Sequence, residues 1–335
     1  MDVFRVATID DIDNIHAITK LAGAGLTTVP RTRERVADYI EEAYRFLSGD
    51  KTANRVLFVA EREGEILGIS GIIPKLGVDR PFYSFKRARH ARRSSAIGLS
   101  VKYDTLQLTT DFDDYTELAT MYLSPKARGT GLSRLLSLGR IAFIERHRNL
   151  FDTRLMAEIR GWFDADGNSP FWQHLTSKFI QTDFDVADRL STSDGRFIIE
   201  LIPALPIMLN LLPQGVRDCT GKPHELSAIA RGLLVEAGFK DTDLCDLFDG
   251  GPSIECLAKD TMIARTVKLA KTSSDNDGEK LIHFGGHLQG FRATLGLGDL
   301  DAAVAAKGAE AIIKEDIYLA RVYEQRVKGR RSGRS

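Results

Sequence analysis

Three segments that follow one another at residues 118–141 constrain the fold of this chain more than any other feature. Residues 118–123 are an apolar run closed by Pro125, which predicts a buried strand. Residues 126–131 form a basic turn with two glycines, and leucines then recur at helical spacing as far as Ile141. A strand, a glycine turn and a helix form a cradle for a phosphate group, because the first N–H groups of a helix are unpaired and carry a partial positive charge.

The turn itself supplies the residues expected to contact that phosphate. Gly129 and Gly131 let a ligand approach the backbone closely, and Arg128 adds a fixed charge with several hydrogen-bond donors. A tight turn without a ligand would use the same glycines. The sequence lacks the Gly-Lys-Ser/Thr ending of nucleoside triphosphate loops and the Gly-x-Gly-x-x-Gly pattern of dinucleotide sites.

The spacing Arg128-x-x-Gly131-x-Ser133 resembles the pyrophosphate loop of GNAT proteins, the acyl-CoA-dependent N-acyltransferases, whose pattern is Arg/Gln-x-x-Gly-x-Gly/Ala. Ser133 departs from the last position but is still small. The resemblance implies that Arg128, Gly129, Gly131 and Ser133 contact the pyrophosphate of an acyl-CoA. It also predicts that Gly131→Val hinders this ligand in a protein that still folds.

The composition narrows the class of partner. Lys+Arg and Asp+Glu are balanced at 46 each, which argues against a general nucleic-acid or membrane binder. The longest apolar region, 197–213, is interrupted by a glutamate and two prolines and is no clean membrane span. The cysteines at positions 219, 245 and 256 have no metal or redox spacing, and residues 1–10 do not resemble a signal peptide. We therefore expect a cytoplasmic protein with reduced cysteines and no metal.

The predicted elements follow the GNAT order of strand, helix, helix, three or four strands, glycine loop and helix. They lie at 4–7, 12–21, 33–47, 56–61, 66–73, 99–109, 118–123 and 132–141. The fold class is therefore α+β with a mixed sheet. Residues 22–30 form a loop that could shape a substrate pocket. The basic residues between 86 and 93 are predicted to lie between strands, either as a solvated face or as a contact for an anionic acyl group or the CoA 3′-phosphate.

The rest of the chain suggests an additional α/β lobe and a small β-containing tail. Strands are predicted at 155–159 and 197–202 and another opening at 178–179, with helices entered near 168 and at His224. The predicted domains are a GNAT-like acyl-CoA-binding domain at 1–190, a second lobe at 191–258 and a tail module at 259–335. In the tail, 271–280 is a polar linker or loop tip and 326–335 is a disordered basic end; residues 291–297, the helix-like 300–307 and 316–323 suggest the small β-containing module.

Several ordered stretches together resemble the arginine N-succinyltransferase family. They are residues 21–30, 123–125, 157–161, 168–172, 183–188, 224–239 and 246–256. The resemblance implies transfer of succinyl from succinyl-CoA to the α-amino group of L-arginine, giving N2-succinyl-L-arginine and CoA. Succinyl-CoA is then a co-substrate, and no tightly bound cofactor is expected. We also expect a homo- or hetero-oligomer with a paralogous subunit.

The same resemblance implies roles for single residues. The family's succinyl-CoA contact falls on Leu123, and its proton-donor histidine falls on His224. In GNAT proteins an Asn at a helix start and nearby aromatic residues line the CoA arm, and Asn168 with Phe171, Trp172 and Phe179 resembles that arrangement. On residue type alone, a histidine at a helix start is more often a cap or a surface residue.

A guanidinium substrate requires carboxylates, and its own carboxylate requires an arginine. Glu158 and Arg160 lie two apart on one predicted strand and share a face, although they may instead pair with neighbouring residues. Asp249, in a Gly-Gly-Pro turn, is a second carboxylate candidate whose alternative role is formation of the turn.

Two classes of function follow. The first is a catalytic arginine N-succinyltransferase, or a GNAT enzyme that uses ornithine, another amine or another acyl-CoA. The second is a non-catalytic CoA-binding subunit that supports an active paralogue in a hetero-oligomer. Retention of the glycine loop together with His224 favours catalysis.

Overall fold

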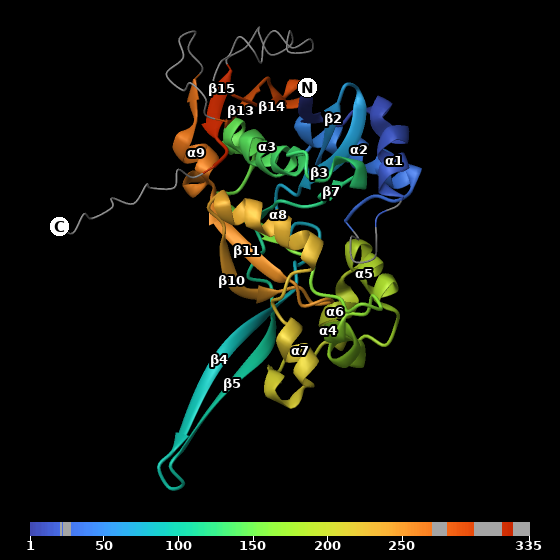
Figure 1. Cartoon of the computed structure of the whole chain (residues 1–335). Coiled ribbons are helices and arrows are strands. Elements are labelled where there is room, and N and C mark those ends of the chain that lie inside the picture. Colours follow the sequence, from blue (N-terminus) through green and yellow to red (C-terminus); the bar gives the residue numbers. More distant parts are fainter. Residues whose placement is uncertain (21, 23–27, 270–279, 298–316, 324–335) are drawn as a thin grey trace, which may run out of the picture.

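A computed structural model describes residues 1–20, 22, 28–269, 280–297 and 317–323 (Figure 1). In this part of the chain the strands form an eight-stranded sheet and a seven-stranded sheet, with helices against both. Most neighbouring strands are antiparallel, but β6 (Thr116–Glu117) and β8 (Arg154–Glu158) are parallel. The α+β class with a mixed sheet is therefore confirmed. The N-terminal order is strand, two helices, strands, glycine turn and helix as expected, but six strands, β2 to β7 (56–123), precede the turn in place of three or four.

The first sheet joins the two ends of the chain. Its strands, in spatial order, are β12 (Lys268–Leu269), β15 (Tyr318–Arg321), β13 (Lys280–Gly285), β14 (Arg292–Leu297), β1 (Asp2–Val6), β2 (Val56–Arg62), β3 (Glu65–Ile72) and β7 (Tyr122–Leu123). Antiparallel pairing of Phe4 with Ala293 places a strand of the tail directly against the first strand of the chain.

The second sheet begins beside the first and ends in a long hairpin. Its order is β6, β8, β11 (Pro252–Leu257), β10 (Lys240–Cys245), β4 (Ser84–Ser94), β5 (Leu99–Thr109) and β9 (Ile207–Met208). The eleven-residue strands β4 and β5 pair along their full length and project from the body of the molecule (Figure 1). Ile97, Leu99 and Val101 on this hairpin are 68%, 59% and 55% exposed.

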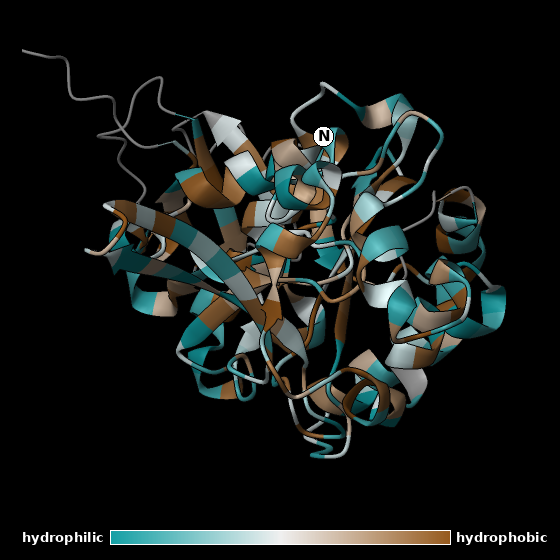
Figure 2. Cartoon of the chain, turned by 90° about the horizontal axis from the view of Figure 1, so that it is seen from below, coloured by the Kyte–Doolittle hydropathy of each residue, from teal (hydrophilic) through white to brown (hydrophobic). Residues whose placement is uncertain are grey.

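Helices with one apolar face cover the sheets, and their outer surfaces carry hydrophilic as well as hydrophobic segments (Figure 2). In α2 (Arg33–Leu47) the Thr32 side chain accepts the N–H of Arg35 at 3.2 Å, and Val36, Tyr39 and Ile40 are buried at helical spacing. The other helices are α1 (Ile12–Thr19), α3 (Leu132–Arg146), α4 (Pro170–His174), α5 (Phe184–Ser193), α6 (Arg196–Leu201), α7 (Gln214–Cys219), α8 (Glu225–Glu236) and α9 (Met262–Thr266).

Helix α3 lies at the centre of the main core. Residues 135–144 are buried without interruption, because the helix packs against β3, β13 and β14 and also against α8 and α9. The glycine turn thus precedes a helix that is fixed on several sides, which makes the start of α3 a rigid place on which to hold a ligand.

Four local predictions are wrong. Residues 118–123 are not one strand, since only Tyr122–Leu123 is a strand there. Residues 197–202 are mostly helix α6, because a short apolar run before a proline does not distinguish a strand from a helix. No strand opens at 178–179, where a short 3-10 helix, Thr176–Lys178, ends. The basic residues 86–93 lie within strand β4 rather than between strands.

Strand pairing crosses the domain limits expected at 190 and 258. β11 pairs with β8, and β14 pairs with β1. Most of 271–280, the helix-like 300–307 and the basic end 326–335 fall outside the described residues. Among the helices of the described chain, none combines the length and apolar character needed to cross a bilayer.

Candidate active site

The edges of the two sheets separate at residues 118–121. β7 is the outermost strand of the first sheet and β6 that of the second, and the chain passes from one to the other between them. The N–H of Leu118 still donates to Met156 O of the second sheet at 2.8 Å, whereas Ala119 O already accepts from Gly71 N of the first at 2.9 Å. Thr120 has a left-handed φ of 51° at this crossing. The change of sheet leaves an opening between two strand edges.

This opening is a cavity of about 810 Å³ lined by residues of both sheets and of helices α3, α5 and α8. Of the residues expected from the sequence, it brings together Leu123, Arg128, Gly129, Ser133, Glu158, Arg160 and Asp249. Gly131, Asn168 and His224 are not among the described residues that line it. Of the predicted loop 22–30, Thr28 lines the cavity, and most of the loop lies outside the described residues.

Backbone N–H groups of the crossing segment are available to a ligand. Ser124 N donates to Leu67 O at 2.8 Å, and in an antiparallel ladder the N–H of the adjacent residue points to the opposite edge. The N–H of Leu123 therefore points away from β3, toward the opening. Within the described chain, the N–H groups of Ala119, Thr120 and Met121 also donate to no protein acceptor. These groups can bind an extended ligand or an oxyanion.

The glycine turn has the geometry that a phosphate cradle requires. After a short 3-10 helix, Pro125–Ala127, Gly129 and Gly131 have φ values of 77° and 87°. Gly131 is the N-cap of α3, so the first N–H groups of this helix lie next to it. Arg128 is exposed beside the turn and lines the cavity. Because a left-handed φ is unfavourable for valine, Gly131→Val strains the backbone with or without a ligand.

Glu158 is the last residue of β8, and Arg160 follows two residues after the strand has ended; both line the cavity. Glu158 Oε1 is buried and has no hydrogen-bond partner in the described chain. Burial raises the pKa of Glu158 well above its usual range, and the neighbouring Asp246, Glu117 and Asp249 add to the effect. The guanidinium of Arg160 lies 4.5 Å from the ring centre of Phe163, and burial lowers its pKa.

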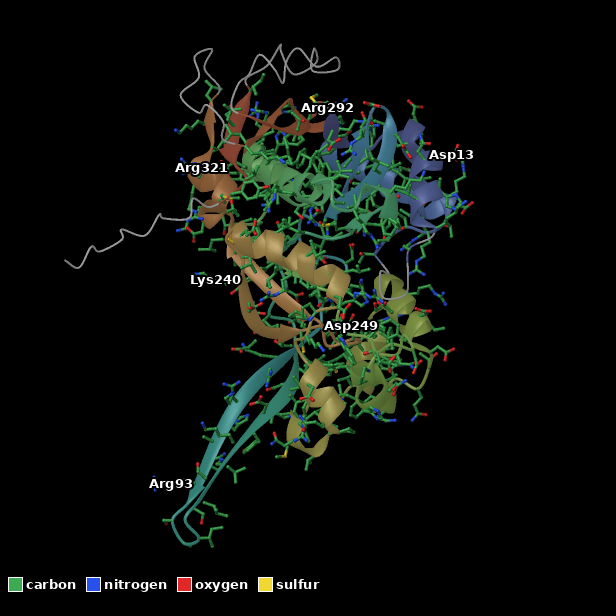
Figure 3. The ribbon with its side chains drawn as sticks, viewed as in Figure 1. Asp13, Arg93, Lys240, Asp249, Arg292 and Arg321 are labelled. Carbon is green, nitrogen blue, oxygen red and sulfur yellow. The ribbon has the colours of Figure 1, made fainter. Side chains whose placement is uncertain are left out.

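Asp249 has a structural role at the base of the cavity. Its Oδ2 accepts from Gly161 N and its Oδ1 from Gly251 N, each at 2.8 Å. The residue is 5% exposed, and burial raises its pKa well above the usual range. Both oxygens thus fix the turn before β11 against the end of β8, in the middle of the molecule (Figure 3).

His224 caps helix α8 beside this turn. The imidazole Nδ1 of His224 accepts the backbone N–H of Leu226 at 3.2 Å. The backbone N–H of His224 donates to the carbonyl oxygen of Arg160 at 2.9 Å. Burial and the charge of Arg160 lower its pKa below the usual value. Leu226 and Ser227, the second and third residues of the helix, line the cavity, so His224 lies at its margin.

Sequence reasoning missed a group of charged residues in the cavity wall. Glu117 is 8% exposed, and burial raises its pKa to about 7 although Arg55, Arg140 and Arg80 oppose the shift. Arg140 is 1% exposed, donates to Ala119 O at 3.0 Å, and has its pKa lowered to about 10 by burial. A signal was present, because Glu117 precedes an apolar run and Arg140 interrupts the apolar pattern of a buried helix.

Other predicted contacts are not brought to the cavity. Asn168 is exposed in a turn closed by Asp164, and Ser169, not Asn168, is the N-cap of α4. Phe171 and Trp172 are buried in a hydrophobic core together with Phe85, Leu106 and Phe248. The basic residues of β4 lie along the projecting hairpin, where Arg93 is far from Asp249 (Figure 3). Lys86 pairs with Asp111 and Arg87 with Asp104. In the described chain no group of His, Cys, Asp or Glu is arranged to hold a metal ion.

Comparison with known proteins gives consistent relatives. The family described as arginine N-succinyltransferase beta subunit matches residues 2–263. The arginine N-succinyltransferases of Escherichia coli O6:H1 and O6:K15:H31 are each 34% identical over 261 residues, which are 76% of this chain and 76% of theirs. The structure of arginine/ornithine succinyltransferase subunit AI from Pseudomonas aeruginosa is similar with a TM-score of 0.82 and 26% identity, and the match covers 96% of this chain and 99% of that chain.

Proposed function

This chain belongs to the arginine N-succinyltransferase family, and from that premise we propose that it transfers the succinyl group of succinyl-CoA to the α-amino group of L-arginine. The products are N2-succinyl-L-arginine and CoA. The observation that carries the proposal is the cavity between two strand edges, which has a glycine cradle before α3 and an acidic and basic pair at the end of β8.

The CoA part of the substrate fits the edge of β7. Its pyrophosphate would lie on the N–H groups at the start of α3, with Arg128, Gly129, Gly131 and Ser133 around it. The N–H of Leu123 points into the opening, where it can donate to the extended arm of CoA. Asn168 is exposed and is not among the described residues that line the cavity, so we assign it no contact with CoA.

The reaction requires attack by the amine, stabilisation of the oxyanion that forms and departure of the thiolate. The neutral α-amine attacks the thioester carbonyl carbon, whose oxygen becomes negative. The N–H groups of residues 119–121 are available to stabilise that oxyanion. The C–S bond then breaks, the attacking nitrogen loses one proton as the amide forms, and the CoA thiolate takes up one proton. His224 at the cavity margin is our candidate to supply the proton to the thiolate and to be reprotonated by the one that the nitrogen loses.

The amino acid would lie at the end of β8. The unpartnered, buried oxygen of Glu158 suits a guanidinium, and Arg160 two residues later suits the α-carboxylate. We do not assign a contact to Asp249, because backbone N–H groups already occupy both of its oxygens. Ornithine is the alternative amine, since the similar Pseudomonas aeruginosa protein is described as an arginine/ornithine succinyltransferase.

An oligomer in the cytoplasm is part of the proposal. The long β4–β5 hairpin exposes Ile97, Leu99 and Val101, and such apolar residues on a projecting arm favour contact with another subunit. That subunit is either a second copy of this chain or a paralogue. The cysteines are buried and free, as in a reducing compartment. Light scattering of the purified protein, alone and with a paralogue, measures the assembly directly.

A thiol-release assay tests the function. Purified protein is incubated with succinyl-CoA or acetyl-CoA and with L-arginine, L-ornithine or L-norleucine, and the product mass is measured. We expect the highest kcat/KM for succinyl-CoA with arginine. Absence of turnover with every pair would contradict catalysis and favour a CoA-binding subunit that supports a paralogue.

A further inference from the structure

Arg80 is a cavity residue whose charge has no direct partner in the described chain. It lies in the segment between β3 and β4, is partly buried, and lines the opening between the sheets. In the described residues it makes no ion pair within 4.0 Å and no hydrogen bond. Its Nη1 lies 3.2 Å from the position that a Cβ on Gly195 would occupy, so the absence of a side chain there leaves room for the guanidinium.

Arg55 approaches the same wall from the start of β2. Its Nε donates to Glu42 at 3.1 Å, and its guanidinium lies 3.8 Å from the ring centre of Tyr39. The ion pair and the ring fix the orientation of the side chain, which is 18% exposed and lines the cavity. The hydrogen bond to Glu42 uses Nε, so within the described chain the Nη groups of Arg55 remain available to a ligand.

The wall around these residues carries charges of both signs, with three arginines acting on one buried glutamate. Arg55, Arg80 and Arg140 all act on Glu117, whereas Glu42 is engaged by Arg55. Longer-range attraction on Arg80 comes from Glu117, Asp79 and Asp194, but burial has the largest effect and lowers its pKa. The partly buried charge of Arg80 costs free energy while it has no direct partner in the described chain, and an anion that binds beside it would offset that cost.

The position of this wall suggests which anion it binds. Arg140 donates a hydrogen bond to Ala119 O. Residues 119–121 carry the available N–H groups, on which the thioester carbonyl of the proposed reaction would lie. Glu117, whose pKa burial raises and the charges of Arg55 and Arg80 lower, precedes this segment by two positions and lines the same cavity. A carboxylate attached to the acyl chain would thus lie beyond the carbonyl, away from the glycine cradle and on the side of Arg80.

We propose that Arg80 and Arg55 form a carboxylate subsite for the far end of a dicarboxylic acyl group carried on CoA. The inference rests on the proposed function and deepens it, because it names the residues that distinguish succinyl-CoA from acetyl-CoA. The basic hairpin, which the sequence offered as the source of this contact, does not supply it. Ion pairing of guanidinium and carboxylate, often through two parallel hydrogen bonds, provides the specificity.

Calorimetric titration of Arg80→Gln with succinyl-CoA and with acetyl-CoA, without an amine, tests the subsite independently of turnover. We expect the Kd for succinyl-CoA to rise roughly tenfold to a hundredfold, the range for loss of a hydrogen bond to a charged group, and the Kd for acetyl-CoA to stay within about twofold. Arg55→Gln should show the same selectivity, and Arg80→Lys should lose less. Arg92→Gln, on the hairpin, is the matched control and should change neither Kd.

The α-carboxylate of L-arginine is a second carboxylate that Arg80 could bind. Titration with L-arginine and with agmatine, which lacks the α-carboxylate, distinguishes it from the carboxylate of the succinyl group. If Arg80→Gln weakens L-arginine but not agmatine and leaves succinyl-CoA unchanged, the residue binds the amino acid and the subsite is overturned. Equal weakening of both thioesters, or of neither, in the folded variant also overturns it. Failure of the wild-type protein to turn over, with the thioester selectivity intact, would instead count against the proposed function alone.

Discussion

His224 and Leu226 are linked by a hydrogen bond in which the backbone N–H of Leu226 donates to Nδ1 of the imidazole at 3.2 Å. In a neutral imidazole one nitrogen accepts and the other carries the proton. Acceptance at Nδ1 therefore places the ring proton on Nε2. A base acting through Nε2 would need the other tautomer, and a proton donor would need the imidazolium, in which Nδ1 also carries a proton. Proton transfer in either direction therefore requires the hydrogen bond from Leu226 to break.

We predict that His224→Ala lowers kcat by roughly two to four orders of magnitude, because a positioned acid or base contributes about that much. Burial and Arg160 lower the pKa of His224, so the limb of the pH–rate profile that belongs to it should lie below ~6.5. Steady-state kinetics across pH, with the CoA affinity measured in parallel, provides the test.

His224→Asn is the matched control for this histidine. Asparagine is a good N-cap and restores the acceptor for Leu226, but it does not titrate. A proton donor requires that both variants lose activity while only the alanine variant loses stability, by about 1 kcal/mol. Normal kcat in a folded asparagine variant would show that His224 is a cap and nothing more.

Arg128→Ala should raise the KM for the thioester by roughly tenfold and leave kcat little changed, because it removes a charge beside the phosphate cradle. Lys126→Ala is a suitable control, since Lys126 is exposed in the same basic turn but is not among the residues that line the cavity. Equal KM changes in the two variants would indicate a general charge effect and not a specific phosphate contact.

The sequence predicted the glycine cradle because its evidence is local. Two glycines, a helical leucine pattern and the apolar run before them are enough to place a turn at the start of a buried helix. It also placed Glu158 and Arg160 close together from the period of a strand, and both line the cavity although β8 ends at Glu158. Both conclusions need only a few neighbouring residues.

The division between the two sheets was not predictable in the same way. An apolar run at 118–123 looks the same whether its residues pair with one sheet or with two, and the partners Gly71 and Met156 are distant in sequence. The cavity wall depends on the same long-range pairing, so Arg55, Arg80, Glu117 and Arg140 meet only after the sheets form. For Gly131 the sequence indicated close approach of a ligand, whereas its φ of 87° shows an additional backbone requirement.

Glu158→Gln and Asp249→Asn should have different effects although both remove a buried carboxylate. Glu158 Oε1 has no partner in the described chain, so the first variant should stay folded and raise the KM for L-arginine selectively. Both oxygens of Asp249 accept backbone N–H groups. In the asparagine variant the side-chain NH2 group would face one of these N–H donors, which should cost about 1–3 kcal/mol of stability. Urea unfolding and steady-state kinetics of both variants distinguish the roles. A stable Asp249→Asn variant with a raised KM for arginine would reverse this assignment.

Glu117 should make the stability of the protein fall as the pH rises from about 4.5 to about 7. Burial raises its pKa from 4.5 to about 7, so the folded protein holds the proton more tightly than the unfolded chain does. Below pH 4.5 Glu117 is protonated in both the folded and the unfolded state, so it does not lower the free energy of unfolding. Above pH 7 the buried carboxylate is ionised, and the loss of unfolding free energy is complete. A shift of this size corresponds to about 3 kcal/mol at most.

Glu117→Gln isolates this contribution, because glutamine resembles the protonated side chain at every pH. Other buried carboxyl groups, Glu158 and Asp249 among them, also titrate, so the informative quantity is the difference in unfolding free energy between variant and wild type. We expect that difference to be near zero at pH 4.5 and to favour the variant progressively up to pH 8, as measured by urea unfolding. Glu65→Gln, at an exposed position, should show no such trend. A constant difference for Glu117→Gln across this range would mean that the carboxyl does not change its ionisation there.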